Sequence, residues 1–500
     1  MTEMNRRSFL ARSAAVTGST VLASTLLSTL DVAATAKPPP LSDVDRGDWY
    51  TGGYGPLQPV PAANDPGVAY FALPAGFSYV VLGRTGTPMV SDPSLLNARS
   101  HDGMAAFRGH GRLVRLTRNH EDRNAPGQGT VGGRIETKYD PLSGGGVTVL
   151  DYDPRSRRIV RDFIGVNGTH VNCAGGIAWR RAGWLTCEET VAGPEAGYGR
   201  KHGYVFFLPA SAKRTVTAEP LTAMGRFLHE AVAVDQRTGV VYLTEDAGSG
   251  RGSGFYRFLP HDPARLARGG RLQILMVRGA PQVDLREGQT AHRWLPVSWL
   301  DIDQPDPDPV IDIELPGATS VFAQGYAAGG AKFNRLEGIW AAERSFFIAS
   351  TSGGDAKSGD VNADGFAEGF GQIWEYVPDR HGGDGRLRLA FESPGGSVLD
   401  SPDNLTLTPR GHLLLCEDDA SGDGDGHPLA PGLTDVNRVI GLTRDGRTFE
   451  FVVNRFSASE LAGACFSPDG RTLFLNVFGG AEPGSGFTAA ITGPWRRGVL

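Results

Sequence analysis

One short unit recurs along this 500-residue chain: an apolar strand, a tight turn and a second apolar strand, with acidic or amide residues at the ends. The unit occurs over residues 102–121, 173–189, 230–246, 337–351, 403–419 and 462–478. Strand pairs repeated at blade-sized spacing are typical of a β-propeller. The sequence therefore predicts an all-β fold, a six-bladed β-propeller with loop insertions. Equivalent strand ends would then meet around one axis.

Residues 37–500 are long enough to form this propeller as a single domain. Residues 37–75 are rich in Pro and Gly and are expected to form an extended lead-in. Gly76–Gly83 reads as a strand, and we expect it to pair with the last repeat, because closing the ring removes exposed sheet edges. The longest gap between repeats indicates an insertion around residues 260–320.

The N-terminus has the pattern of an export signal. Arg6 and Arg7 precede Ser-Phe-Leu, a mildly apolar run follows, and a small-residue cleavage pattern ends at Ala36. Residues 1–36 are therefore predicted to be a twin-arginine signal peptide, cleaved after Ala36, whose partner is the twin-arginine translocase. This predicts a periplasmic or extracellular protein without a permanent membrane span. The alternative is two surface arginines near a flexible terminus.

Composition excludes some function classes. The formal net charge is −6 and the isoelectric point is about 6.0, with Lys and Arg dispersed along the chain, so nucleic acid is not an expected partner. The protein is expected to be a monomer. Cys187, Cys416 and Cys465 lie inside apolar strands, where a buried, inert thiol is the simplest interpretation. Cys173 differs, since it lies at the start of its repeat, where other copies have acidic residues.

The repeat places many potential metal ligands at the same phase, because alternate residues of a strand face one side. At the beginnings of first strands these are Asp102, Cys173, His229, Glu230, Arg335, Glu337, Asp403 and Asn404. At the ends of second strands they are Asn119, Glu121, Glu188, Glu189, Glu245, Asp246, Glu417 and Asp418. So many carboxylates in one place require cations or protonation. A single acid at a strand end is more often a turn cap, but doublets repeated at one phase favour a multi-metal site.

The ligand types indicate which metals fit. Oxygen ligands suit Ca²⁺, whereas a thiolate among carboxylates points to a transition metal beside it. A structural zinc site is not indicated, because neither CxxC nor HxxxH accompanies Cys173. Asp360–Gly365 matches the first half of a calcium loop but lacks the closing Glu, so a solvated turn is the alternative. Asp418–Gly426 is similarly acidic and matches less well.

Arg335 precedes Glu337 by two residues, so both side chains should point to the same side of the strand. A guanidinium beside metal ions suits an anionic tetrahedral substrate and favours phosphoryl chemistry. The alternative is a plain Arg–Glu ion pair.

Several motifs resemble the PhoX family of alkaline phosphatases, and the likeness covers almost all of the chain that follows the signal. These are Asn172-Cys173-Ala-Gly-Gly with Cys187-Glu188-Glu189, Asn119-His120-Glu121, His229-Glu230, Arg335-Leu-Glu337 and Asp403-Asn404. The resemblance implies a six-bladed propeller, twin-arginine export, hydrolysis of phosphate monoesters, and a cofactor of two ferric ions with several calcium ions. It also implies that Cys173 ligates iron and that Arg335 holds the phosphate. Glu230 and Glu337 would lie near the metals, and Glu121, Glu188, Glu189, Asp403 and Asn404 would serve iron or calcium.

Two other functions stay open on the sequence. A calcium-dependent lactonase or esterase would need one axial Ca²⁺ and would leave Cys173 idle. A non-enzymatic binding propeller would keep metals only to stabilise the ring.

Overall fold

The computed structural model describes residues 53–247, 251–313, 315–380, 383–419, 422 and 424–499. The predicted signal peptide, residues 1–36, lies outside these residues. The described chain is almost entirely β-structure, with one α-helix, α2 (Val321–Ala328). Single-turn 3₁₀ segments are η1 (Ile135–Thr137), η2 (Trp179–Arg181), η3 (Pro194–Ala196), η4 (Thr222–Met224), η5 (Leu266–Arg268) and η6 (Trp495–Arg497). No helix in the described ranges is both long and apolar enough to cross a membrane.

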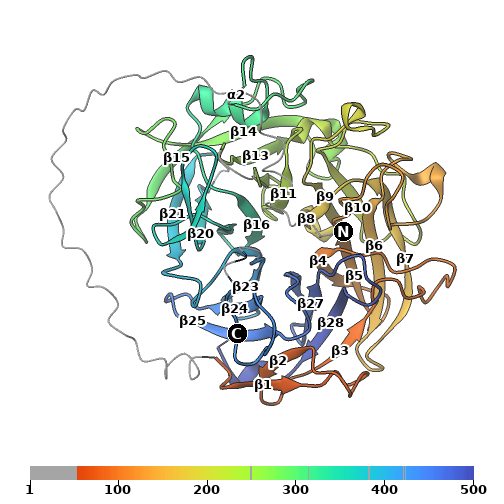
Figure 1. Ribbon diagram of the computed structural model, residues 1–500. Coiled ribbons are helices and arrows are strands. Elements are labelled where there is room, and N and C mark those ends of the chain that lie inside the picture. The colour runs from red at the N-terminus through yellow and green to blue at the C-terminus, as the bar shows by residue number, and fades with distance from the viewer. Residues whose placement is uncertain are drawn as a thin grey trace.

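Each predicted repeat is an antiparallel hairpin, so this part of the sequence prediction is confirmed. In chain order the hairpins are β4–β5 (His101–Arg108, Val114–His120), β8–β9 (Asn172–Ile177, Gly183–Glu188), β11–β12 (His229–Val234, Val241–Glu245), β16–β17 (Leu336–Ala341, Phe346–Ser350), β22–β23 (Pro402–Leu407, Leu413–Glu417) and β26–β27 (Leu461–Phe466, Thr472–Val477). Each first strand contacts the first strand of the next hairpin, and β26 contacts β4, which closes the ring. Figure 1 shows the sheets arranged around a central axis.

Outer strands extend each hairpin away from the axis. They are β6 (Gly145–Asp153), β7 (Arg158–Thr169), β10 (Val205–Pro209), β13 (Phe255–Pro260), β14 (Gly270–Val277), β15 (Leu295–Asp301), β20 (Gln372–Pro378), β21 (Gly385–Glu392), β24 (Arg438–Leu442), β25 (Thr448–Asn454) and β28 (Phe487–Thr492). A separate two-stranded sheet is formed by β18 (Lys357–Val361) and β19 (Ala367–Gly369).

The blade count of six is not confirmed, because hydrogen bonding does not divide the described strands into six separate sheets of blade size. Four sheets have four or more strands, with six, nine, four and four members, and β8–β10 form a sheet of three. The nine-stranded sheet arises because β15 pairs with both β14 and β21 and so joins two hairpin units. The segment around 260–320, which the sequence predicts to be an insertion, includes β15. Part of this segment therefore belongs to the nine-stranded sheet.

The ring is closed as the sequence predicts. β3 (Ser78–Leu82), from the N-terminal side, pairs with β28 near the C-terminus. The lead-in before β3 also contains strands, since β1 (Leu57–Val60) and β2 (Phe71–Pro74) extend the sheet beyond β25. These pairings cover sheet edges that would otherwise be exposed.

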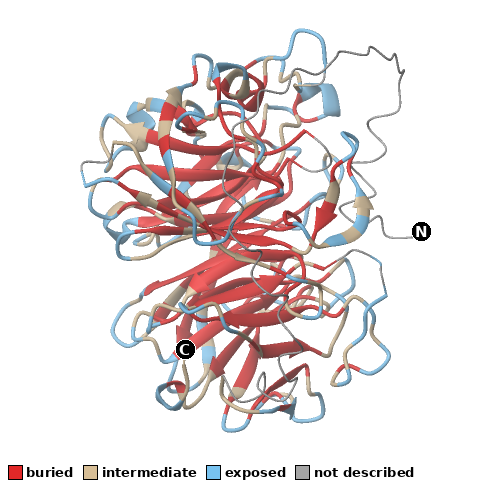
Figure 2. Ribbon diagram, turned by 90° about the vertical axis from the view of Figure 1, so that its left-hand side faces the viewer, coloured by how far each residue is buried: buried red, intermediate tan, exposed pale blue. Residues whose placement is uncertain are grey.

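The core lies between neighbouring sheets, and exposed residues are concentrated in the loops (Figure 2). Trp184 and Trp374 are the largest fully buried side chains, and aromatic residues such as Phe71, Tyr79 and Phe487 pack where the first and last strands meet. Fully burying one such apolar side chain stabilises the fold by about 1.5–3 kcal/mol.

Candidate metal centre

The first strands surround a central channel along the axis of the ring, and the end of the channel where these strands begin is called here the mouth. A β-bulge near the start of every first strand shapes this mouth. In β8, Asn172 pairs with Glu188, but Gly175 pairs with Thr186, so the register shifts across Cys173 and Ala174. The same shift occurs between His101/Met104, His229/Val232, Leu336/Ile339, Pro402/Leu405 and Ala462/Cys465. A bulge redirects side chains out of the regular pleat. In five hairpins the shifted segment carries a metal-ligand residue type: Asp102, Cys173, Glu230, Glu337 and Asp403.

The residue after each second strand is fixed at the same mouth. Its backbone N–H donates to the carbonyl two residues before the bulged position, as in Glu121 to Ser100 (3.0 Å) and Glu189 to Val171 (2.9 Å). Ser100 and Val171 both have positive φ, which non-Gly residues rarely adopt. Asp246, Thr351 and Asp418 make the equivalent bond to Leu228, Arg335 and Ser401. These bonds place Glu121 and Glu189 beside the bulged residues.

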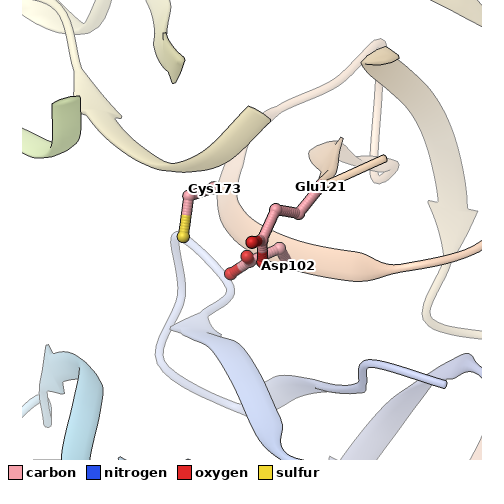
Figure 3. Close-up of side chains that lie close together, drawn as sticks. All are labelled: Asp102, Glu121 and Cys173. Atoms are coloured by element: carbon pink, nitrogen blue, oxygen red, sulfur yellow. The ribbon is translucent and has the colours of Figure 1, made fainter. Parts of the chain in front are cut away.

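Three groups of potential ligands form at this mouth, and in each the ligand atoms lie within 4.8 Å of one another. The groups are Asp102–Glu121–Cys173, Cys173–Glu189–Glu230 and Glu230–Glu337–Asp403. All seven residues are buried. Cys173 and Glu230 each belong to two groups, so the seven form one continuous arc, named here the ligand arc. Figure 3 shows the first group: Asp102 from β4, Cys173 from β8, and Glu121, which follows β5.

Among the residues that the structure describes, Arg335 and Arg123 contact the ligand arc. Arg335 donates from Nε and Nη2 to Asp246 (3.1 and 2.8 Å) and from Nη2 to Glu337 (3.0 Å). Burial alone would lower the pKa of Arg335, but the charges of Asp246 and Glu337 raise it well above its usual value. Arg123 lies between Glu121 and Glu189 and forms ion pairs with both. The sequence did not single out Arg123, although it follows Glu121 by two residues, the mirror image of the spacing between Arg335 and Glu337.

Two residues of the ligand arc, Glu230 and Cys173, have raised pKa values, and a bound cation would lower both. Burial, with the charges of Glu337 and Asp403, raises the pKa of Glu230 well above its usual value. Burial, with the charges of Asp102 and Glu230, does the same for the Cys173 thiol, whose Sγ contacts Glu230 Oε1 at 3.1 Å. Glu230 Oε2 is buried and forms no hydrogen bond within the described part of the chain. A buried carboxylate oxygen without a hydrogen-bond donor is suited to bind a metal ion. A cation there would favour the charged forms of both the Glu230 carboxyl and the Cys173 thiol.

The residues present therefore fit the metals that the sequence predicts. Carboxylate oxygens dominate the ligand arc and suit hard cations such as Ca²⁺. The thiol of Cys173, shared by two groups, suits a transition metal.

Three of the predicted ligands are buried but lie outside these groups, because nearby donors occupy their carboxylates. Glu188 accepts hydrogen bonds from His202 Nδ1 and the backbone N–H groups of residues 170, 203 and 204. Glu245 binds Arg251, the Tyr256 hydroxyl and the backbone of residue 254. Glu417 binds the Arg438 side chain and backbone and the N–H of residue 400.

Four further predicted ligands also lie outside the three groups. Asn119 donates to the carbonyls of Cys173 (3.0 Å) and residue 174 (2.7 Å), so it supports the bulge. Asn404 donates to Asp403 Oδ1 at 2.8 Å. Asp246 holds Arg335, and Asp418 is fixed through its backbone bond to Ser401.

The two acidic loops considered for calcium differ in whether they contribute to a group of potential ligands. Asp360–Gly365 joins β18 to β19, and Asp364 forms ion pairs with Arg286 and Lys332. In the described ranges this loop contributes to no group of potential ligands. A group that the sequence did not predict, Asp419–Asp425–Asp435, includes two residues of the acidic segment 418–426.

All four cysteines are buried, as predicted for Cys187, Cys416 and Cys465, and none forms a disulfide in the described structure. The fold and the ligand arc together define a class: an all-β propeller with a buried carboxylate and thiol cluster at one mouth of its channel. The sequence matches the family described as alkaline phosphatase PhoX over residues 52–161 and 154–481. The chain belongs to the PhoX alkaline phosphatase family.

A solved structure of a PhoX protein agrees with this fold. The chain is similar to Pseudomonas fluorescens PhoX in complex with vanadate, a transition state analogue, with a TM-score of 0.60 and 19% identity, covering 89% of this chain and 99% of that one. Weaker similarities are to a luciferin-regenerating enzyme (TM-score 0.34, 12% identity, 83% and 96% covered) and to the periplasmic gluconolactonase PpgL of Pseudomonas aeruginosa (0.33, 11%, 76% and 96%). No curated protein sequence matches the chain.

Proposed function

We propose that this protein is a metal-dependent phosphatase that hydrolyses phosphate monoesters at the ligand arc. The observation that carries the proposal is a buried thiol shared by two groups of carboxylates, with a guanidinium beside the same mouth. Membership of the PhoX family and a solved relative that holds vanadate, named as a transition state analogue, support it.

The chain's own residues would position the substrate and the cofactor. Cys173 and Glu230 would hold neighbouring iron ions, and Glu121, Glu189, Glu337, Asp102 and Asp403 would complete the iron and calcium sites. When bound, these ions would neutralise the charge of the phosphoryl group and polarise it. Asp246 fixes the plane of the Arg335 guanidinium, so Arg335 would orient the phosphate by a charge-assisted contact. Arg123 would act similarly beside Glu121 and Glu189.

The shared thiol is also the reason to prefer this function to a calcium-dependent lactonase. A site for one axial Ca²⁺ would not need a buried thiol within 4.8 Å of four carboxylates drawn from two ligand groups. A binding propeller that uses metals only to stabilise the ring would not need Arg335 at the mouth.

We infer that residues 1–36 direct twin-arginine export with cleavage after Ala36, which suits a cofactor loaded before export. We also infer that the propeller has six blades, one for each hairpin of the closed inner ring, supported by the contacts between consecutive first strands.

The test is to measure metals and activity in protein purified after export, for the wild type and for Cys173→Ala. We expect bound iron and calcium, hydrolysis of p-nitrophenyl phosphate, and loss of both iron and activity in the variant. Calcium alone, unchanged by the substitution, would overturn the iron–thiolate site. Full metal content with no hydrolysis of any monoester would overturn the phosphatase.

A further inference from the structure

A cavity, named here the second cavity because it is a site distinct from the ligand arc, lies at the opposite end of the channel. Its volume is about 530 Å³, and it is lined by the far ends of first strands, including Phe107 and Arg108 of β4, Trp340 of β16 and Phe466 of β26. In β16, Trp340 follows the ligand-arc residue Glu337 by three positions, which is about 10 Å along a strand. The two sites therefore face opposite mouths of one channel.

Small residues close the channel between the two mouths. Gly103, Ala174, Ala231, Gly338 and Gly463 surround a remaining space of only about 20 Å³. A Cβ added at Gly103 would lie 2.5 Å from Ala174 Cα, and one added at Gly338 would lie 2.7 Å from the Asp403 carbonyl oxygen. Backbones packed this closely leave no passage for a ligand. The second cavity is therefore a separate site.

The polar lining of this cavity is positively charged. Arg108 and Arg181 are both exposed at the cavity, and none of its lining residues is an acid. The nearest acid along the chain, Asp469, accepts a hydrogen bond from Ser467 instead. Burial and the neighbouring charge of Arg108 lower the pKa of Arg181, although the effect of Cys465 opposes this shift. Two like charges facing one cavity attract an anion.

Arg181 is held in place for such a contact. Its Nη2 donates to the carbonyl of residue 106 at 3.0 Å, and its guanidinium lies 5.9 Å from the centre of the Phe107 ring. Arg180 and Arg181 both have positive φ (54° and 55°), a conformation that costs free energy at non-Gly residues and occurs where surrounding structure enforces it.

The walls of the cavity supply an apolar surface and one further polar group. Phe107, Trp340 and Phe466 provide aromatic surface. Thr406 is 1% exposed, and its Oγ1 has no hydrogen-bond partner among the residues that the structure describes. Thr406 is one of the lining residues of the cavity.

We propose that this cavity binds a small organic anion, with a carboxylate against Arg108 and Arg181 and an aromatic body against Phe107, Trp340 and Phe466. A cavity of this volume matches the size of small-molecule sites in proteins. The proposal does not depend on the phosphatase activity, because the channel is closed between the two mouths.

The experiment compares 2-naphthoate with its uncharged analogue 2-naphthamide by isothermal titration calorimetry on the metal-loaded protein. We expect 2-naphthoate to bind and 2-naphthamide to bind at least about tenfold more weakly, since a hydrogen bond to a charged group is lost. Arg181→Gln and, independently, Arg108→Gln should each weaken 2-naphthoate about tenfold. Arg344→Gln is the matched control, because Arg344 is 82% exposed and lies outside the cavity lining.

Binding at the ligand arc is distinguished by Arg335→Gln, which should leave the affinity for 2-naphthoate unchanged. Near-ultraviolet circular dichroism checks that every variant is folded. Equal affinity for the two compounds, unchanged affinity in both Arg108→Gln and Arg181→Gln, or loss of binding in Arg335→Gln alone would each overturn the proposal.

Discussion

Two sets of buried carboxylates lie in the inner hairpins of the ring, yet their surroundings differ. Glu230 and Glu337 belong to the ligand arc at the channel mouth, where acids share their space with other acids and a thiol. Glu245 and Glu417 end second strands, and each is bound by its own arginine, Arg251 and Arg438. Both sets are fully buried. A buried carboxylate with its own counterion depends on that partner, whereas a cluster in which the acids outnumber the guanidiniums is suited to metal ions.

Loss of a ligand-arc carboxylate should therefore affect metals and activity rather than folding. We expect Glu230→Gln to lower phosphatase activity by at least about 100-fold, because Glu230 belongs to two ligand groups. In chelated protein the same substitution should be neutral or stabilising, since burial and neighbouring charges already disfavour the Glu230 carboxylate. Elemental analysis and thermal unfolding with and without chelator measure both effects.

The matched control is Glu245→Gln, a buried Glu in the adjacent strand of the same hairpin. It should retain its metals and lose stability, because Arg251 would be left without this partner. If instead Glu230→Gln keeps its full metal content, the ligand arc does not bind the metals.

Removal of the counterion from the second set should destabilise the fold. Arg438→Gln leaves Glu417 buried without its guanidinium, and we expect a loss of about 3–5 kcal/mol in the free energy of unfolding at pH 8. Burial raises the pKa of Glu417 to about 7, although Arg438 opposes this shift.

The variant's stability should depend on pH. Without Arg438 the folded pKa of Glu417 rises further, so the folded chain keeps a proton that the unfolded chain releases near pH 4.5. Stability should then fall as pH rises from about 5 to 8, and the loss at pH 5 should be smaller. Denaturant unfolding at both pH values tests this, and an equal loss at pH 5 and pH 8 would contradict it.

The sequence predicted the hairpins and the unusual position of Cys173 from local pattern, and it predicted the closing strand β3 because the last repeat would otherwise leave an exposed sheet edge. It did not separate Glu188 from Glu189, although successive strand residues point to opposite faces, so one member of such a doublet should face away from the axis. The partner of Glu188 is His202, 14 residues away, and that of Glu417 is Arg438, 21 residues away. Such contacts depend on outer-strand geometry that the hairpin pattern does not contain.

Arg335 combines features of both sets, since it pairs with Asp246 and also contacts the ligand-arc residue Glu337. We expect Arg335→Lys to lower the catalytic rate constant about tenfold or more, because a lysine cannot reproduce the two-point contact of a guanidinium with Asp246 and phosphate. Metal content should stay at the wild-type level. Steady-state kinetics on p-nitrophenyl phosphate with elemental analysis measure this, and unchanged kinetics would mean that Arg335 is only an ion-pair partner.

The smallest change tests whether the close packing of first strands sets the geometry of the ligand arc. In Gly338→Ala the new Cβ would lie 2.7 Å from the Asp403 carbonyl oxygen and 3.1 Å from Asn404 Cα, so the backbone of β22 must shift. We expect a loss of about 1–3 kcal/mol in the free energy of unfolding, together with weaker metal binding by the group that contains Asp403. Gly395→Ala is the control, because a Cβ there meets no atom within 4 Å. Equal unfolding and metal affinity in the two variants would show that the ligand arc tolerates movement of the strand that carries Asp403, and that the tight ring serves only to close the channel.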